Sequence, residues 1–172
     1  HEDNQALATL SELYRELERW PDLMEIVERR IALAAAESES RRELTFEAAE
    51  LSHRQLQDPP LAIERYREVL GGDNGHDGAR AALEELLREE DYCLTVCEIL
   101  APLYRQDGNW DALIRIHEMQ AERAESPSEK VTLLTTCAEI HEEQRDELAD
   151  AFSAYHRALV AAAAEPELPQ LV

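Results

Sequence analysis

Apolar residues recur along the chain at the three- and four-residue intervals that mark one face of a helix. Leu7, Leu10, Leu13 and Tyr14 form one such stripe, and a second runs from Leu23 to Ile31. No segment of four to eight residues alternates apolar and polar positions among β-branched types, so no strand is predicted. Ala, Leu, Glu and Arg, which favour helices, dominate the chain. We therefore expect an all-α fold.

The few prolines and glycines separate the helical stretches from one another. Asp58 before a proline pair, Asn109, and Ser126 before Pro127 are typical helix starts. Pro102 is the exception, because it lies inside a stretch and should kink or split that helix. Nine helices are predicted, at about 4–18, 21–36, 40–56, 60–70, 77–89, 92–106, 110–124, 128–145 and 147–162.

The second half of the chain repeats the first. An offset of 90 pairs identical residues in the early helices: Leu10, Leu13, Tyr14, Arg15, Trp20, Leu23 and Ile26 with Leu100, Leu103, Tyr104, Arg105, Trp110, Leu113 and Ile116. An offset of 89 does so further on: Leu44, Ala49, Glu50, Gln55, Ala62, Tyr66 and Leu70 with Leu133, Ala138, Glu139, Gln144, Ala151, Tyr155 and Leu159. A repeat of this kind indicates stacked structural units.

Each half divides again into steps the length of one helical hairpin. Leu10 to Ala48 is 38 residues and Leu100 to Cys137 is 37. A lone hairpin cannot cover both of its apolar stripes, so hairpins stack and bury a continuous core. We expect one solenoid of antiparallel hairpins over 1–172, with units at about 4–36, 40–70, 92–124 and 128–162 and an inserted helix at about 77–89.

The small and aromatic residues of these units resemble the tetratricopeptide repeat (TPR) family. The family's spacing is best kept in the fourth unit, which has Ala138 and His141 in its first helix and Ala151, Tyr155 and Ala158 in its second. The first and third units depart from it by placing Leu at positions 23 and 113, where the family has Ala. The resemblance implies an α-solenoid whose first helices line a concave groove that binds peptides or partner proteins.

Net charge and cysteine content narrow the functional classes. The 172 residues carry a formal net charge of −21, which opposes binding to nucleic acids and anionic membranes. No apolar run approaches the roughly 18 residues of a membrane-spanning helix. Three cysteines make no disulfide framework and indicate a reducing, cytoplasmic setting. Without an initiator Met or a signal peptide, the chain is expected to be a piece of a longer protein.

Two sequence patterns are compatible with metal binding. Cys93 and Cys97, like Cys137 and His141, have the i, i+4 spacing of two zinc ligands on a helix. In the repeat register the two pairs are out of step by about seven residues, or about 10 Å, so we expect core cysteines. The segment 73–78 with Glu84 partly matches a calcium-binding loop, and turn chemistry explains the same residues.

No enzyme active site is indicated. The chain has no nucleophile motif, no HExxH sequence and no glycine-rich phosphate loop. Clusters of acidic residues are expected on the solvated faces of the helices. We therefore predict a non-catalytic chain that needs no cofactor and no metal.

The TPR resemblance assigns groove positions to the first helix of each unit. These candidate residues are Glu12, Arg15, Glu16, Glu43, Phe46, Glu50, Arg54, Glu98, Arg105, Glu139 and Glu142. Because carboxylates outnumber guanidinium groups, the groove is expected to prefer a basic peptide or protein, less tightly at high salt. The alternative is that these acids only keep the repeat array in solution.

The main prediction is a protein-interaction scaffold. Two alternatives remain open: a regulatory or docking segment of a larger multidomain enzyme, and a metal-binding helical domain. Neither end of the chain shows a polar capping helix, and Ala164 to Val172 resembles the start of another unit. Exposed apolar ends predict self-association through the ends of the solenoid.

Overall fold

The computed structural model describes residues 2–163, with side chains from Gln5 onward. In this part of the chain all regular structure is α-helical. The helices are α1 (Glu2–Glu16), α2 (Trp20–Leu33), α3 (Glu39–Arg54), α4 (Pro59–Gly72), α5 (Asp77–Leu86), α6 (Glu90–Asp107), α7 (Trp110–Arg123), α8 (Pro127–Glu143) and α9 (Leu148–Ala163). The nine predicted helices are thus confirmed, each end lying within three residues of its expected place.

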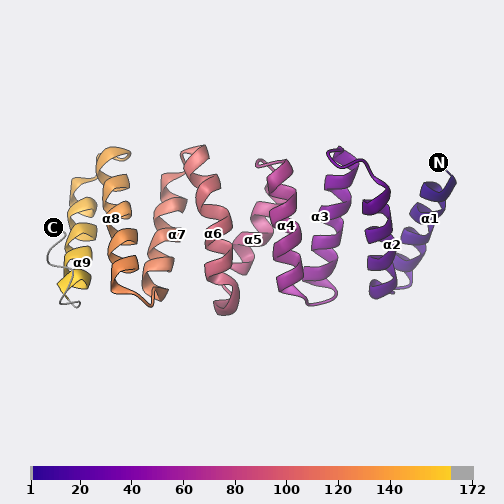
Figure 1. Cartoon of the computed structure of the whole chain (residues 1–172), viewed down its shortest axis with the longest axis horizontal. Helices are drawn as coiled ribbons and strands as arrows, with labels where there is room; N and C mark the ends of the chain where they lie inside the picture. The colour runs from indigo at the N-terminus through magenta and orange to yellow at the C-terminus, as the bar shows by residue number, and fades with distance from the viewer. Residues whose placement is uncertain (1, 164–172) are drawn as a thin grey trace. The chain divides into compact units, whose positions relative to one another are not determined.

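The chain divides into two compact units, His1–Tyr92 and Cys93–Val172. Within each unit consecutive helices lie side by side and alternate in direction, as Figure 1 shows. This arrangement confirms the expected all-α solenoid of antiparallel hairpins.

Side chains at the predicted helix starts act as caps. Asp58, Asn109 and Ser126 each accept a hydrogen bond from the backbone N–H three residues further on, and Ser38 does the same at α3. Pro102 does not split its helix, because α6 runs through it without interruption. Its side chain is exposed, so the proline ring leaves the apolar faces of α6 intact.

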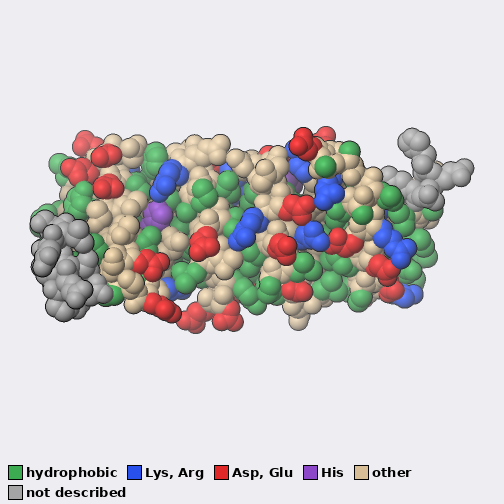
Figure 2. Space-filling model, viewed as in Figure 1, with side chains coloured by type: hydrophobic (Ala, Val, Ile, Leu, Met, Phe, Trp, Pro, Cys, Tyr) green, Lys and Arg blue, Asp and Glu red, His purple; other side chains and the backbone are tan. Residues whose placement is uncertain are grey.

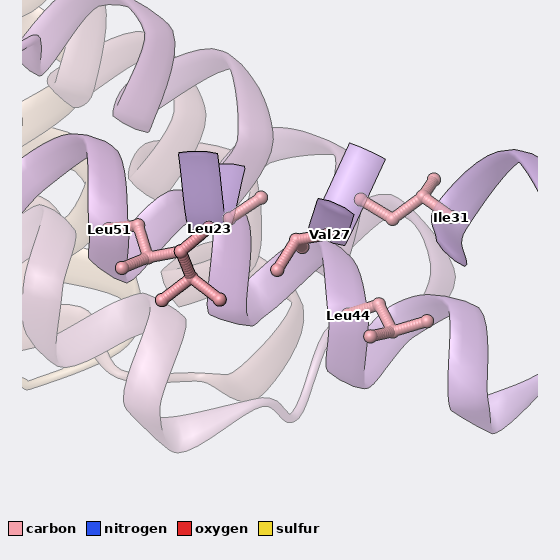
Figure 3. Close-up of a cluster of buried hydrophobic side chains, with 6 residues drawn as sticks. Leu23, Val27, Ile31, Leu44 and Leu51 are labelled. Carbon is pink, nitrogen blue, oxygen red and sulfur yellow. The ribbon is translucent and has the colours of Figure 1, made fainter. Parts of the chain in front are cut away.

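The core of the first unit lies mainly between α2 and α3. Leucine, valine and isoleucine side chains of the two helices point toward one another in Figure 3, and Tyr14, Trp20 and Met24 pack around them. The buried set is Leu23, Val27, Ile31, Leu44, Ala48 and Leu51. The fifth helix, predicted as an insert, packs against α4 and buries Ala79, Ala82, Leu83 and Leu86.

In the second unit, small side chains of α9 form its buried face. α9 buries Ala151, Ala154, Ala158 and Ala162, one stripe at helical spacing, and packs against α8. Alanine allows two helix backbones to approach closely, which explains why the repeat keeps Ala at positions 62 and 151. No helix in residues 2–163 is long and apolar enough to cross a membrane.

Candidate functional site

The predicted groove positions of the first unit lie on exposed faces of α1 and α3. Arg15 of α1 forms an ion pair with Glu47 of α3, which joins these two faces although α2 separates the helices in sequence. Glu12 and Glu16 lie beside Arg15 on α1, and Glu43 lies one turn before Glu47 on α3. The fold therefore brings together the α1 and α3 residues that the sequence assigned to one surface.

Three carboxylates of this surface have no cationic partner. Among residues 5–163, Glu12, Glu16 and Glu43 form no ion pair or side-chain hydrogen bond, and all three are exposed. Arg15 is neutralised by Glu47. We call Glu12, Glu16 and Glu43 the acidic triad of the first unit. The triad leaves uncompensated negative charge on this surface.

A cluster of polar side chains lies at the C-terminal end of α3, next to the same surface. Arg54 donates to Glu50 through Nε at 2.7 Å, and its Nη2 lies 3.6 Å from Glu85 of α5. The hydroxyl of Tyr66, a fully buried residue of α4, also donates to Glu50. Burial alone would raise the pKa of Glu50, but the bonds from Tyr66 and Arg54 outweigh it and lower that pKa. Glu50 and Arg54 are therefore held in a network of bonds and contribute less free charge than expected.

Phe46 is half-buried rather than displayed on the surface. Its ring centroid lies 4.5 Å from that of His76 and 6.0 Å from that of Tyr66. Gly78, at the start of α5, faces the tip of the ring. The main role of Phe46 visible in the structure is therefore to pack α3 against α4 and α5.

The second unit carries an equivalent surface on α6 and α8. Glu98, Arg105, Glu139 and Glu142 are all exposed. The hydroxyl of Tyr155 donates to Glu142 at 3.2 Å, on the hairpin equivalent to the one where Tyr66 donates to Glu50. Figure 2 shows acidic and basic side chains interspersed over the face of the molecule in view.

The cysteines lie in the core. Cys93, Cys97 and Cys137 are buried free thiols, and the thiol of Cys137 donates to the carbonyl of Ile114 at 3.8 Å. Burial raises the pKa of both Cys97 and Cys137 to about 12. These thiols are therefore kept protonated and shielded from solvent, which is the core placement that the repeat register predicted.

His141 belongs to a different cluster from the cysteines. Its Nδ1 lies 2.9 Å from Glu147, and the potential metal-ligand atoms of His141, Glu147 and Asp150 all lie within 4.8 Å of one another. Arg145 donates to both oxygens of Glu147, each at 2.7 Å. The bonds from Arg145 and His141 lower the pKa of Glu147 to about 2. A guanidinium group thus occupies the carboxylate that a metal ion would need.

Turn and cap bonds account for the segment that resembled a calcium loop. Asp73 accepts from the backbone N–H of Gly75 at 3.1 Å, and His76 caps α5 by accepting from Ala79 at 3.1 Å. Because α5 already begins at Asp77, the glycine at position 78 lies in a helical turn. The segment therefore joins α4 to α5 as an ordinary helix connection.

Two pockets lie outside the predicted groove, and none of the groove candidates lines either of them. A pocket of about 420 Å³ in the first unit and one of about 650 Å³ in the second occupy the same place in the repeat. The offset of 89 relates five lining residues of each: Arg41, Thr45, Glu68, Gly71 and Gly72 correspond to Lys130, Leu134, Arg157, Val160 and Ala161. The internal repeat was the sequence signal that could have located them.

The charges around the two pockets differ. In the first unit Arg41 lies 3.5 Å from Glu68, which offsets the charge of Arg41. In the second unit Arg157 replaces that glutamate and pairs instead with Glu118 of α7 at 2.8 Å. Each pocket is therefore bridged by an ion pair between helices, which is a structural role.

Comparison with known families gives a match within the second unit. The family model described as "Tetratricopeptide repeat" matches residues 96–131. The match covers most of the third predicted unit and the first residues of the fourth, whereas the residue pattern was best kept in the fourth. A solved structure described as "Podosopora anserina putative kinesin light chain nearly identical TPR-like repeats" is similar at 14% identity, with a TM-score of 0.41, and the match covers 95% of this chain and 96% of that chain. No curated protein matches the chain. The chain therefore contains one recognised tetratricopeptide repeat, over 96–131, within an all-α arrangement of helical hairpins.

Proposed function

We propose that this chain is a non-catalytic protein-interaction module that binds a basic segment of a partner protein through the first-helix surface of its first unit. TPR repeats in general mediate protein–protein interaction, and TPR-like proteins are generally non-catalytic scaffolds. The proposal goes further by naming the surface and the charge of the partner. It includes a cytoplasmic location, with which three free thiols are consistent.

The acidic triad is the observation that carries the proposal. Glu12, Glu16 and Glu43 are exposed and without ion pairs in residues 5–163, and the Arg15–Glu47 pair joins the helices that carry them. The guanidinium group of Arg15, which lies beside Glu12 and Glu16 on α1, is paired with Glu47 instead. Lysine and arginine side chains of a partner would supply the missing cations, and association would be accelerated by electrostatic attraction.

The structure also limits what else this surface can contribute. Phe46 is packed against α5, and Glu50 and Arg54 are bonded to each other. No deep apolar anchor site is therefore part of the proposal. Binding that rests on exposed charges is modest in affinity and strongly salt-dependent.

A charge-reversal experiment tests the proposal. Two labelled peptides of equal length, one rich in lysine and one rich in glutamate, are titrated with the chain and followed by fluorescence anisotropy. We expect the lysine peptide alone to bind, and its Kd to rise about tenfold or more between about 50 and about 500 mM NaCl. The triple variant Glu12→Lys, Glu16→Lys, Glu43→Lys should abolish binding.

A matched control distinguishes the effect of this surface on binding from the effect of net charge. Glu25, Glu64 and Glu125 are exposed acids on α2, α4 and the α7–α8 connection, and changing all three to Lys alters the net charge by the same amount. This control should keep at least half of the binding affinity. Equal loss in both triple variants, or tighter binding of the glutamate peptide, would overturn the proposal.

A further inference from the structure

α9 carries two stripes of opposite character. Its alanine stripe is buried against α8, whereas a second stripe of large apolar residues is exposed. The exposed stripe consists of Leu148, Phe152, Tyr155 and Leu159, with the i, i+4, i+7, i+11 spacing of one helix face. An apolar helix face of this length is typical of a helix that packs on another helix.

The repeat shows that the same face is covered in the first unit. By the offset of 89, Phe152, Tyr155 and Leu159 correspond to Ile63, Tyr66 and Leu70 of α4. The exposed fractions are 73, 38 and 56% on α9 but 4, 0 and 3% on α4. α4 differs in having α5 packed against it. A second helix of a hairpin thus normally has another amphipathic helix on this face, and α9 lacks one among residues 2–163.

α1 carries a complementary exposed stripe. Leu10 and Leu13 of α1 and Leu17, in the turn directly after it, are exposed large apolar residues. With Ala6 they repeat the i, i+4, i+7, i+11 spacing of the α9 stripe. Each stripe is about 16 Å long at 1.5 Å per residue. The side of α1 that carries Ser11 and Tyr14 is the one turned inward. The leucine stripe therefore has no partner within the described part of its own unit.

The packing inside each unit indicates how these stripes would meet. α2 packs on α3 and α7 packs on α8, so the second helix of one hairpin contacts the first helix of the next. α9 is a second helix, and α1 is a first helix. Contact between them repeats a packing that the chain already uses twice.

We propose that the apolar stripe of α9 docks on the apolar stripe of α1 in a second copy of this chain. The interface is heterologous, because each copy contributes a different helix, and it leaves one α1 stripe and one α9 stripe free at the ends of the assembly. None of the acidic triad belongs to either stripe. The inference is therefore independent of the proposed function.

Net charge sets the salt dependence of this association. Each copy carries a formal charge of −21, so two copies repel each other at low ionic strength. Salt screens this repulsion and leaves the apolar contact in place. Self-association should thus strengthen as salt is raised, whereas binding of a basic peptide should weaken.

Sedimentation velocity on the full 172-residue chain tests the proposal. At about 100 µM protein and about 300 mM NaCl, conditions in which the Debye length is short, we expect dimers and larger species. Phe152→Glu removes the α9 stripe, and Leu13→Glu removes the α1 stripe. Each variant alone should be monomeric, while an equimolar mixture should form dimers and nothing larger, because one intact stripe of each kind remains.

Leu94→Glu is the matched control. Leu94 is an exposed leucine of α6 that belongs to neither stripe, so this variant should assemble as the unaltered chain does. Circular dichroism checks that all three variants remain helical. A monomeric unaltered chain would overturn the proposal, since the stripe would then be covered by residues after Ala163 or by another protein. Dimers of Leu13→Glu alone would also overturn it, in favour of α9 pairing with itself.

Discussion

Gly78 of α5 faces the ring of Phe46 on α3 so closely that a Cβ atom at position 78 would lie 2.9 Å from Cζ of the ring. Non-bonded carbon atoms prefer separations of about 3.5–4.0 Å. The missing side chain therefore lets α5 approach the aromatic residues of α3 and α4. α5 packs on α4, whose Ile63, Tyr66 and Leu70 are buried although the equivalent residues of α9 are exposed.

Replacing Gly78 with Ala should destabilise the first unit. In an unconstrained helix this change stabilises by about 0.5–1 kcal/mol. Here the added methyl group has to displace a ring held between His76 and Tyr66. We expect a net loss of about 1 kcal/mol in the free energy of unfolding, measured by urea denaturation.

Replacing Phe46 with the smaller side chain of Leu tests this explanation. Leucine has no atom at the Cζ position, so Gly78→Ala in a Phe46→Leu background should be neutral or stabilising. A double-mutant cycle should give a coupling energy of about 1 kcal/mol or more. Stabilisation by Gly78→Ala in the unaltered background would contradict the close contact.

Tyr66 and Tyr155 occupy equivalent positions but should respond differently to loss of the hydroxyl. Tyr66 is buried and donates to Glu50, whereas Tyr155 is 38% exposed and donates to Glu142 at 3.2 Å. Tyr66→Phe should cost about 1–2 kcal/mol, because it removes the donor from a carboxylate that is only partly solvated. Tyr155→Phe should change stability by less than about 0.5 kcal/mol.

The cost of Tyr66→Phe should also depend on pH. The pKa of Glu50 lies below its ordinary value of 4.5 in the folded chain, so its bonds stabilise the fold above that pH and lose this effect as pH falls through the folded pKa. The difference between Tyr66→Phe and the unaltered chain should therefore shrink toward pH 3. An equal difference at pH 7 and pH 3 would show that Glu50 is not the partner that matters.

The helices could be predicted from local signals because more than one signal marks each helix start. Asp58, Asn109 and Ser126 combine a cap with the onset of an apolar stripe, and each marks a real helix start. The effect of Pro102 could not be predicted in the same way. Its effect depends on which face of α6 it occupies, and that face is set by how Ile99 and Leu103 are buried.

The surface was less predictable than the fold. Repeat register placed Glu12, Glu16 and Glu43 on exposed faces, as helical periodicity can do. It could not show that Glu50 and Arg54 bond to each other or that Phe46 packs beneath α5, because these contacts join helices far apart in sequence. The pockets were missed for the same reason, since they form between helices rather than along one.

The buried thiols should be unreactive in the folded chain. Cys97 and Cys137 have a pKa raised to about 12 by burial, and all three cysteines are buried. At pH 8 a disulfide reagent such as DTNB should label no thiol within the time in which an unfolded sample reacts completely. Rapid labelling of one thiol in folded protein would show that the second unit opens locally.

His117 is the residue whose replacement should most change the response to mild acid. It is buried, its Nδ1 lies 3.0 Å from Gln120, and its Nε2 has no hydrogen-bond partner. Burial, together with repulsion from Arg105, lowers the pKa of His117 below its ordinary value of 6.5. As pH falls below 6.5 the unfolded chain takes up this proton before the folded chain does, so stability should decline.

The internal repeat indicates which residue to place at position 117. Val27, which lies 90 residues earlier at the equivalent position of α2, is fully buried. Val has no polar atom to leave unpaired and no proton to bind. His117→Val should therefore match the unaltered chain at pH 8 to within about 1 kcal/mol and exceed it in stability at pH 5. Urea denaturation at the two pH values measures both differences. If the variant loses as much stability between pH 8 and pH 5 as the unaltered chain does, another group controls the acid response.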